Sequence, residues 1–280
     1  MNRLFWLGVN RSILTVPVQK IEGALSAAQQ DLLAVEEPLE IRASDRTVSI
    51  TMRTPGHDFE LAAGFLFTEG ILDGAHQIRE IRWSASEGNP RQAANSVTVQ
   101  LVPGVEIDFA RLERHFYTSS SCGVCGKASI QALETQGCPV LPRDEPLVDR
   151  ALIHRLPEAL RSRQTIFDRT GGLHAAGLFH VSGELALERE DIGRHNAVDK
   201  LIGAEMLAGH MPLHQNLILV SGRASFELVQ KALMAGIPIL AAVGAPSSLA
   251  VETAQRFNMT LVGFVRDGRF NIYSGASRIQ

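Results

Sequence analysis

The region from Leu217 to Val265 constrains the fold most, because short apolar runs alternate there with amphipathic stretches. Leu217–Val220, Ile237–Val243 and Leu261–Val265 are almost wholly apolar. The two stretches between them place apolar residues three and four positions apart, as helices with one buried face do. Apolar strands separated by such helices indicate a parallel sheet that is covered on both faces. The sequence therefore predicts an α/β region with a mainly parallel sheet.

The first half of the chain has a different pattern. Residues 39–43 and 48–52 alternate apolar and polar side chains around a Ser-Asp-Arg turn, which predicts a hairpin. Residues 59–67 repeat at helical spacing and are followed by Gly70, a common helix terminator. Residues 78–83 and 97–102 give two further alternating strands. This half is therefore predicted to be a small α+β unit.

A proline-bounded stretch, Pro142–Pro146, separates the two patterns and is interpreted as a linker. We therefore expect two domains, residues 1–140 and 141–280. Asp267-Gly268 is predicted to turn the chain into an antiparallel strand at the sheet edge.

Small, hydroxylic and cationic residues follow the predicted parallel strands. In open α/β sheets, ligands bind beyond the carboxyl ends of these strands. Two of the loops also open helices, whose N-termini suit phosphate. We therefore expect a phosphorylated ligand, although ordinary helix caps and surface arginines would give the same pattern. The residues concerned are Ser221, Gly222, Arg223, Pro246, Ser247, Ser248, Arg266 and Arg269.

Two more polar stretches, residues 170–176 and 190–196, interrupt apolar sequence. The second places Arg194 and His195 at the predicted start of a helix, beside Gly193, which permits close backbone approach. These two side chains are candidates for the same pocket. The alternative for each histidine is a hydrogen-bonded structural residue.

Cys122 and Cys125 stand in a Ser/Gly-rich stretch with almost no apolar bulk. A helix predicted to begin near Cys125 would point its amide hydrogens and positive end at the sulfurs, and Lys127 adds a positive charge. Because the thiolate is the reactive form, these features favour an exposed, activated dithiol.

Composition bears on what such a dithiol can do. The chain is 45% hydrophobic and 20% charged with a net charge of −3, so no broad attraction to nucleic acid or membrane is expected. Its opening residues lack the pattern of an export signal, and no apolar run is long enough to span a membrane. We expect a soluble cytoplasmic protein, in which a cysteine pair is more typical of catalysis, redox chemistry or metal binding than of a structural disulfide.

Four chemistries compete for the pair. A thioredoxin-like oxidoreductase would place its motif close to a βαβ unit, whereas this pair follows the α+β half and opens a separate segment. A structural zinc site needs four ligands; Cys138 and some histidines could complete one, but the chain has no second spaced pair. Zinc deaminases need an upstream His-x-Glu, and no histidine here has that spacing. A sulfur carrier requires an exposed thiol of lowered pKa on a loop, with a second thiol to release the sulfur.

Taken together, the motifs resemble the FdhD family of formate dehydrogenase accessory sulfurtransferases, in order and over most of the chain. The segments that carry the resemblance are Glu36–Leu39, Glu60–Ile71, Cys122–Gly126, Thr170–Ala176, Glu190–His195, Asp199–Leu201, Ser221–Glu227 and Gly263–Arg269.

This resemblance implies a function. Family members receive sulfur from a cysteine desulfurase and pass it to the molybdenum bis(molybdopterin guanine dinucleotide) cofactor before its insertion into formate dehydrogenase. By likeness, Cys122 would carry the persulfide and Cys125 would assist. The family also implies a homodimer and a second domain similar to cytidine deaminases without their zinc.

The resemblance further associates one segment with cofactor binding: Phe264, Val265, Arg266, Asp267, Gly268 and Arg269. A guanine nucleotide would serve as an analogue of that cofactor, and its phosphates would suit Arg223, Arg266 and Arg269.

Overall fold

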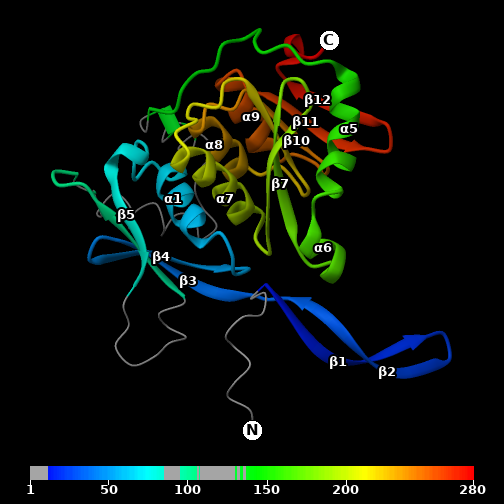
Figure 1. The fold of residues 1–280 in the computed structure, drawn as a ribbon. Helices are drawn as coiled ribbons and strands as arrows, with labels where there is room; N and C mark the ends of the chain where they lie inside the picture. The colour runs from blue at the N-terminus through cyan, green and yellow to red at the C-terminus, as the bar shows by residue number, and fades with distance from the viewer. Residues whose placement is uncertain (1–11, 85–94, 106, 108–129, 131–132, 135–136) are drawn as a thin grey trace.

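The computed structural model describes residues 12–84, 95–105, 107, 130, 133–134 and 137–280 (Figure 1). Its second half is built on a six-stranded sheet with the order β12-β11-β10-β9-β7-β8. The strands are β7 (His174–His180), β8 (Leu185–Asp191), β9 (Asn216–Val220), β10 (Ile239–Ala242), β11 (Thr260–Arg266) and β12 (Arg269–Ser274).

Only β9, β10 and β11 run parallel to one another. β12 pairs antiparallel with β11, and β7 pairs antiparallel with β9 and with β8. The prediction of a mainly parallel sheet was therefore right for the apolar centre and wrong for the flanks. The sheet is mixed because β7 and β8, and likewise β11 and β12, are consecutive strands that pair as antiparallel hairpins, and β9 returns through α7 to lie antiparallel to β7. The likeness to cytidine deaminases remains a prediction.

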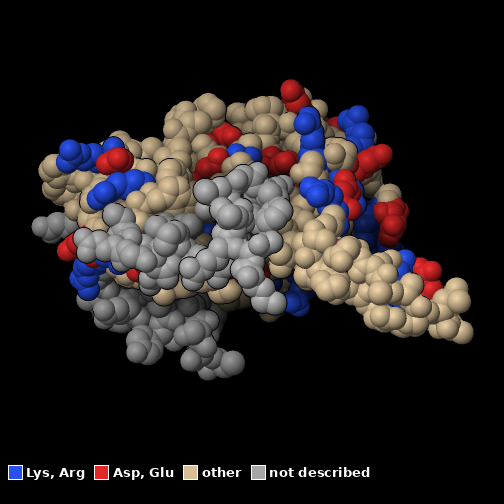
Figure 2. Space-filling model, turned by 60° about the horizontal axis from the view of Figure 1, so that its bottom comes forward, with Lys and Arg blue, Asp and Glu red and all other residues tan. Residues whose placement is uncertain are grey.

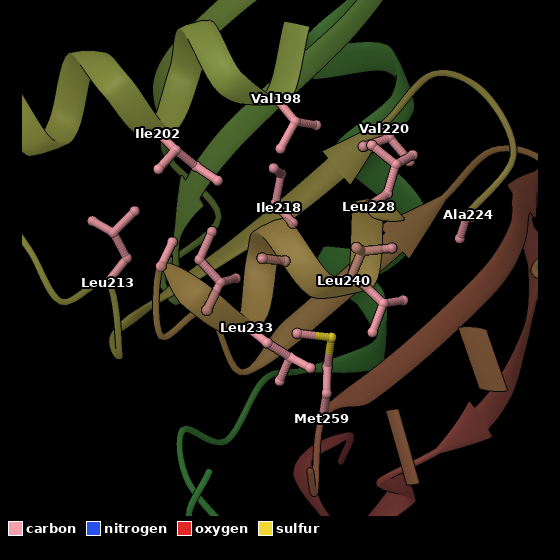
Figure 3. Packing of buried hydrophobic residues seen from close by; sticks show 14 of the residues in the cluster. Val198, Ile202, Leu213, Ile218, Val220, Ala224, Leu228, Leu233, Leu240 and Met259 are labelled. Carbon is pink, nitrogen blue, oxygen red and sulfur yellow. The ribbon is translucent and has the colours of Figure 1, made fainter. Parts of the chain in front are cut away.

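Helices cover both faces of this sheet. On one face lies α5 (Arg150–Arg161), and on the other lie α7 (Arg194–Leu207), α8 (Phe226–Met234) and α9 (Ser248–Arg256). Alternate strand residues divide between two cores: Leu217 and Leu219 pack towards α5, whereas Ile218 and Val220 pack towards α7 and α8 (Figure 3). The wholly apolar β9 is thus explained by burial on both sides.

The first half has its own sheet, ordered β4-β3-β6-β5. Its elements are β3 (Glu37–Ala43), β4 (Arg46–Arg53), α1 (Asp58–Thr68), the short 3-10 helix η1 (Ala75–Gln77), β5 (Ile78–Trp83) and β6 (Ser96–Leu101). The predicted hairpin of β3 and β4, the helix and both later strands are confirmed.

Helix α1 belongs to both halves. Leu61, Ala62 and Leu66 pack under the four-stranded sheet, whereas Ala63 and Phe67 pack with α7 in the core of the second half. The two halves therefore share one helix as a common layer (Figure 1). The predicted boundary near residue 140 is not decided by this arrangement.

Two smaller parts complete the fold. β1 (Ile13–Glu22) and β2 (Leu25–Ala34) form a separate two-stranded antiparallel ribbon, and α6 (Thr165–Thr170) lies near its base (Figure 1). A final 3-10 turn, η2 (Ala276–Arg278), buries Arg278 against the linker. No helix among the described residues has the length and apolar character needed to cross a membrane.

Candidate ligand site at the strand ends

The topology gathers five loops at one edge of the six-stranded sheet. β9, β10 and β11 end there, and β7 begins there because it runs antiparallel to β9, with Ala176 opposite Val220. β8 ends there as well, with Asp191 opposite His174, and α7 starts directly afterwards. His174, Arg194, Ser221 and Arg223 therefore meet at this edge although they are distant in sequence.

Backbone hydrogen bonds join the loops along this edge. The amide of Gly244 donates to the carbonyl of Gly222 at 2.9 Å, and the amide of Phe264 donates to the carbonyl of Gly244 at 3.0 Å. A Cβ on Gly244 would lie 3.0 Å from that Gly222 oxygen, so the approach requires glycine. Ser221 adds a further link to the start of β7, since its Oγ accepts a hydrogen bond of 2.9 Å from the amide of Ala175. The loops that form the base of the site are thus hydrogen-bonded to one another.

Arg194 supplies the main positive charge at the start of α7. Its Nε is buried and has no hydrogen-bond partner among the described residues. The side chain runs past Gly222: a Cβ built there would lie 3.9 Å from the Arg194 Cδ and 3.4 Å from the His174 ring. An unsatisfied guanidinium N–H costs about 1–3 kcal/mol, so an anionic acceptor at this place would be strongly favoured.

The two histidines of the site are neutral at neutral pH. Burial, followed by the charges of Arg194 and Lys231, lowers the pKa of His195 to about 4 against the opposing effect of Glu227. The pKa of His174 is lowered by burial and by Arg194. His195 Nε2 lies 3.2 Å from Ser225 Oγ. The imidazoles can therefore exchange hydrogen bonds with a ligand, while the positive charge comes from arginine.

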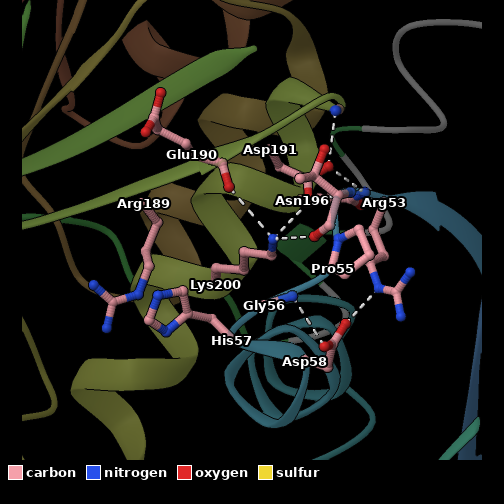
Figure 4. A network of polar contacts seen from close by, with 12 residues as sticks. Arg53, Pro55, Gly56, His57, Asp58, Arg189, Glu190, Asp191, Asn196 and Lys200 are labelled. Carbon is pink, nitrogen blue, oxygen red and sulfur yellow. Dashed lines mark hydrogen bonds and ion pairs between the residues drawn. The ribbon is translucent and has the colours of Figure 1, made fainter. Parts of the chain in front are cut away.

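A buried ion pair holds the start of α7 in place (Figure 4). Lys200 Nζ lies 2.7 Å from Asp191 Oδ2 and donates to the carbonyl of Thr54 at 2.9 Å. Asp191 Oδ1 accepts hydrogen bonds from the amide of Gly193 at 2.8 Å and from Asn196 Nδ2 at 3.0 Å. This network fixes Gly193 and hence Arg194. Asp191, Asn196 and Lys200 were assigned no role from the sequence. The available signal was polar residues at the end of β8 and within the buried part of α7.

The hairpin between β11 and β12 carries the segment associated with the cofactor. Phe264, Asp267 and Gly268 all have positive φ, and Arg266 and Arg269 are exposed at the tip. Val265 is buried in the core beneath α5, so its side chain does not face a ligand at this edge. The tip is joined to the strand-end loops through the hydrogen bond from Phe264 to Gly244.

Comparison with known proteins gives the wider context. Residues 34–280 match the model of the FdhD/NarQ family. The chain belongs to this family. It is 52% identical over 260 residues to "Sulfur carrier protein FdhD" of Streptomyces avermitilis, covering 92% of each chain. It is 40% identical to the protein of that name from Sulfolobus acidocaldarius, covering 95% of this chain and 98% of the other.

A solved structure shows the same fold at lower identity. A formate dehydrogenase accessory protein from Desulfotalea psychrophila superposes with a TM-score of 0.73 at 26% identity, covering 96% of this chain and 99% of that one. The mixed α/β architecture of this chain is therefore shared with that solved structure.

The cysteine pair of this FdhD/NarQ family chain, Cys122 and Cys125, lies outside the described residues. The described residues that follow the pair lie at the edge of the sheet opposite the strand ends. Glu134 pairs with Arg256 at 2.7 Å, and the amide of Leu141 donates to the carbonyl of Phe257. Arg256 closes α9, and Phe257 follows it just before β11 begins. Glu134 and Leu141 are thus anchored at the edge away from the candidate ligand site.

Other features of the anchored edge do not supply reactive groups. Cys138 is buried in the core, and burial raises the pKa of its thiol to about 12, so it acts as a small apolar residue. A cavity of about 400 Å³ also lies at this edge and is lined by Phe67, Met206, Met211 and Met234 among others. Among the described residues, its lining also includes Asp73 and His76 but no lysine or arginine, whereas the strand ends present Arg194 and Arg223.

Proposed function

We propose that this chain is a sulfur carrier that serves formate dehydrogenase. It accepts sulfur from a cysteine desulfurase as a persulfide on Cys122 and delivers the sulfur to the molybdenum bis(molybdopterin guanine dinucleotide) cofactor. Family membership and the names of its relatives support the carrier role. The unpaired, buried Nε of Arg194 at the strand ends carries the proposal that a phosphate-bearing cofactor binds there.

The two thiols of the chain account for every bond and electron in the proposed sulfur transfer. The Cys122 thiolate attacks the outer sulfur of the desulfurase persulfide, and the desulfurase cysteine leaves as a thiolate. On release, the Cys125 thiolate attacks the Cys122 sulfur and expels the outer sulfur as hydrosulfide. The two thiols are oxidised to a disulfide and supply the two electrons that reduce this sulfur. A cellular thiol then restores the pair, which suits the reducing cytoplasm.

The ligand chemistry rests on the strand-end residues. Arg194, with Arg223 and the N-termini of α7, α8 and α9, would bind the phosphates of the guanine dinucleotide arms. Ser221, His174 and His195 would contribute uncharged hydrogen bonds. Arg266 and Arg269, at the hairpin tip, would contact a part of the ligand that remains near solvent.

A persulfide assay on single-cysteine variants tests the proposal. Wild type, Cys122→Ala and Cys125→Ala are incubated with a cysteine desulfurase and cysteine, and each is analysed by mass spectrometry. We expect one added sulfur atom in the wild type and in Cys125→Ala, and none in Cys122→Ala. An adduct that is equally abundant in Cys122→Ala would contradict the assignment of the carrier residue.

The same preparations decide between the proposal and its two alternatives. A zinc-stabilised binding module would contain stoichiometric zinc that is lost in Cys122→Ala. A thiol-disulfide oxidoreductase would reduce a model disulfide substrate at a rate that requires both thiols, without retaining sulfur from cysteine. Either result, obtained without a persulfide on the chain, would favour the corresponding alternative over the carrier function.

A further inference from the structure

Glu227 places a negative charge among the groups that are proposed to bind phosphate. It lies in the first turn of α8, which starts at the strand ends, and its side chain is half-exposed. The other helices that begin at this edge, α7 and α9, have no acidic residue in their first turns. Because a carboxylate repels phosphate, the start of α8 is the least suited of the three to that group, and Glu227 must make a different contact with the ligand.

The carboxylate of Glu227 is held in place by its neighbours. It accepts hydrogen bonds from its own backbone amide and from the hydroxyl of Ser225, the residue that precedes α8. Ser225 Oγ lies 3.2 Å from His195 Nε2. Because a carboxylate can only accept, the Ser225 hydroxyl donates to Glu227 and accepts from the imidazole N–H. These two hydrogen bonds fix Glu227 relative to the start of α7.

Glu227 and Arg194 share the site without pairing. Burial acts to raise the pKa of the Glu227 carboxyl, but hydrogen bonds from its own amide and from Ser225 lower it, as does nearby positive charge that includes Arg194. Within the described part of the chain, the ion-pair contact of Glu227 is with His195 at 3.8 Å, and that ring is neutral. A guanidinium and a carboxylate are therefore both available to one ligand.

A ligand that satisfies both charges carries a phosphate and, apart from it, an edge that donates hydrogen bonds. Guanine presents two neighbouring donors, the ring N–H and the exocyclic amino group, which one carboxylate can accept in a bidentate arrangement. Adenine presents a ring nitrogen with a lone pair at the corresponding place, which a carboxylate repels. The ribose hydroxyls are donors too, but they adjoin the phosphate, whereas Glu227 stands apart from Arg194. The carboxylate is therefore better suited to the guanine base.

We propose that Glu227 accepts hydrogen bonds from the base of the ligand and selects guanine nucleotides over adenine nucleotides. This inference rests on the proposed binding of a guanine dinucleotide cofactor at the strand ends, and it assigns the choice of base to one side chain. Figure 2 shows acidic and basic side chains interspersed over the face that it presents, without a large patch of one sign. Long-range attraction does not distinguish two nucleotides of equal charge, so the discrimination must come from a local contact.

Calorimetric titration of the full-length chain with GDP, ADP and 2′-deoxy-GDP tests the proposal. The wild type should bind GDP about 10- to 100-fold more tightly than ADP, and 2′-deoxy-GDP as tightly as GDP. Glu227→Gln replaces an acceptor oxygen with a donor amide, so it should weaken GDP binding about 10-fold or more without weakening ADP binding. Glu158→Gln removes an exposed carboxylate on α5 and should keep the preference of the wild type.

The ratio of the GDP and ADP affinities is the decisive quantity, because it does not depend on the fraction of a variant that is folded. An unchanged ratio in Glu227→Gln, or equal affinities in the wild type, would overturn the proposal. If Glu227→Gln instead abolished a preference for GDP over 2′-deoxy-GDP, the carboxylate would bind the ribose and the assignment to the base would be wrong. A wild type that bound no nucleotide would contradict the proposed cofactor site itself, whereas GDP binding with an unchanged ratio would overturn the role of Glu227 alone.

Discussion

Gly64 in α1 and Gly203 in α7 bring the two helices into backbone contact. A Cβ on Gly64 would lie 1.9 Å from the carbonyl oxygen of Asp199, and a Cβ on Gly203 would lie 1.9 Å from the carbonyl oxygen of Glu60. No side chain can relieve such a clash, because the opposing atoms are backbone. The close contact lets α1 serve as a layer common to both halves of the chain (Figure 1).

Substitution at this contact should therefore destabilise the whole chain. Gly203→Ala forces α1 and α7 apart, and the resulting loss of packing should cost at least about 2–3 kcal/mol of unfolding free energy. Gly172→Ala is the control, since its Cβ would make only ordinary contacts, with Ala34 at 3.6 Å and Thr170 at 3.9 Å. Chemical denaturation measures both variants. Equal stability of Gly203→Ala and the wild type would refute the close contact.

A bidentate ion pair between Glu60 and Arg189 also joins the halves, with distances of 2.5 and 2.9 Å. Burial acts to raise the pKa of Glu60, but hydrogen bonds and charges from His57 and Arg189 lower it to about 2. Because this lies below the ordinary value of 4.5, the stabilisation is complete above about pH 4.5 and is lost as the pH falls through about 2.

Glu60→Gln should thus lower the unfolding free energy by roughly 2 kcal/mol at pH 7, and by progressively less between pH 4.5 and 2. Asp168→Asn, which removes the exposed partner of Arg161, should change stability by less than about 1 kcal/mol. Denaturant unfolding across this pH range provides the measurement. A constant difference between the wild type and Glu60→Gln would contradict the lowered pKa.

His195 should remain neutral well below the pH at which a free imidazole is protonated. Burial and the charge of Arg194 lower its pKa to about 4, whereas the unfolded chain titrates near 6.5. The unfolded state therefore binds the proton first, and stability falls as the pH drops from about 6.5 towards 4. Side-chain NMR should show the ring titrating near pH 4, and Arg194→Gln should raise this value. A midpoint near 6.5 in the wild type would show that the ring is not buried as described.

Arg194 should dominate binding of a guanine nucleotide, used here as an analogue of the cofactor. Loss of a charge-assisted hydrogen bond worth about 1.5–3 kcal/mol predicts a 10- to 100-fold weaker affinity for Arg194→Gln. Arg161→Gln removes an exposed arginine on α5 and serves as the matched control. Calorimetric titration with GDP would measure both. If Arg194→Gln bound GDP with unchanged affinity, the strand ends would not be the ligand site.

The hairpin tip should make a smaller contribution. Arg266 is half exposed, so contacts from Arg266 and Arg269 are partly screened by solvent. Arg266→Ala with Arg269→Ala should weaken GDP binding several-fold, and the effect should diminish as the salt concentration rises. An affinity equal to that of the wild type at low salt would place the tip outside the site.

The predictable parts of the fold were those dictated by local pattern. Apolar runs such as Leu217–Val220 predicted the buried central strands, and alternation predicted the hairpin of β3 and β4. The direction of β7 and β8 was not predictable, because strand pairing depends on distant partners and not on local periodicity. The ribbon of β1 and β2 was not predicted, because its apolar residues lie among Gln and Ala and show no clear alternation.

The site was predictable to the same extent. Arg194, Ser221 and Arg223 were found because polar residues at strand ends and helix starts interrupt apolar sequence. The pairing of Lys200 with Asp191 was not, because only the fold brings β8, α7 and the loop at Thr54 together. The position of Glu134 at the opposite edge was not predictable either, because its pairing with Arg256 depends on long-range packing.

The central claim is that sulfur held on Cys122 moves to the cofactor. The chain is loaded with radiolabelled sulfur by a cysteine desulfurase and cysteine, separated from the desulfurase, and mixed with molybdenum bis(molybdopterin guanine dinucleotide). We predict that the label passes to the cofactor from the wild type, more slowly from Arg194→Gln, and not from Cys122→Ala. Label that stays on the wild-type chain, or reaches the cofactor equally with Cys122→Ala, would contradict the account.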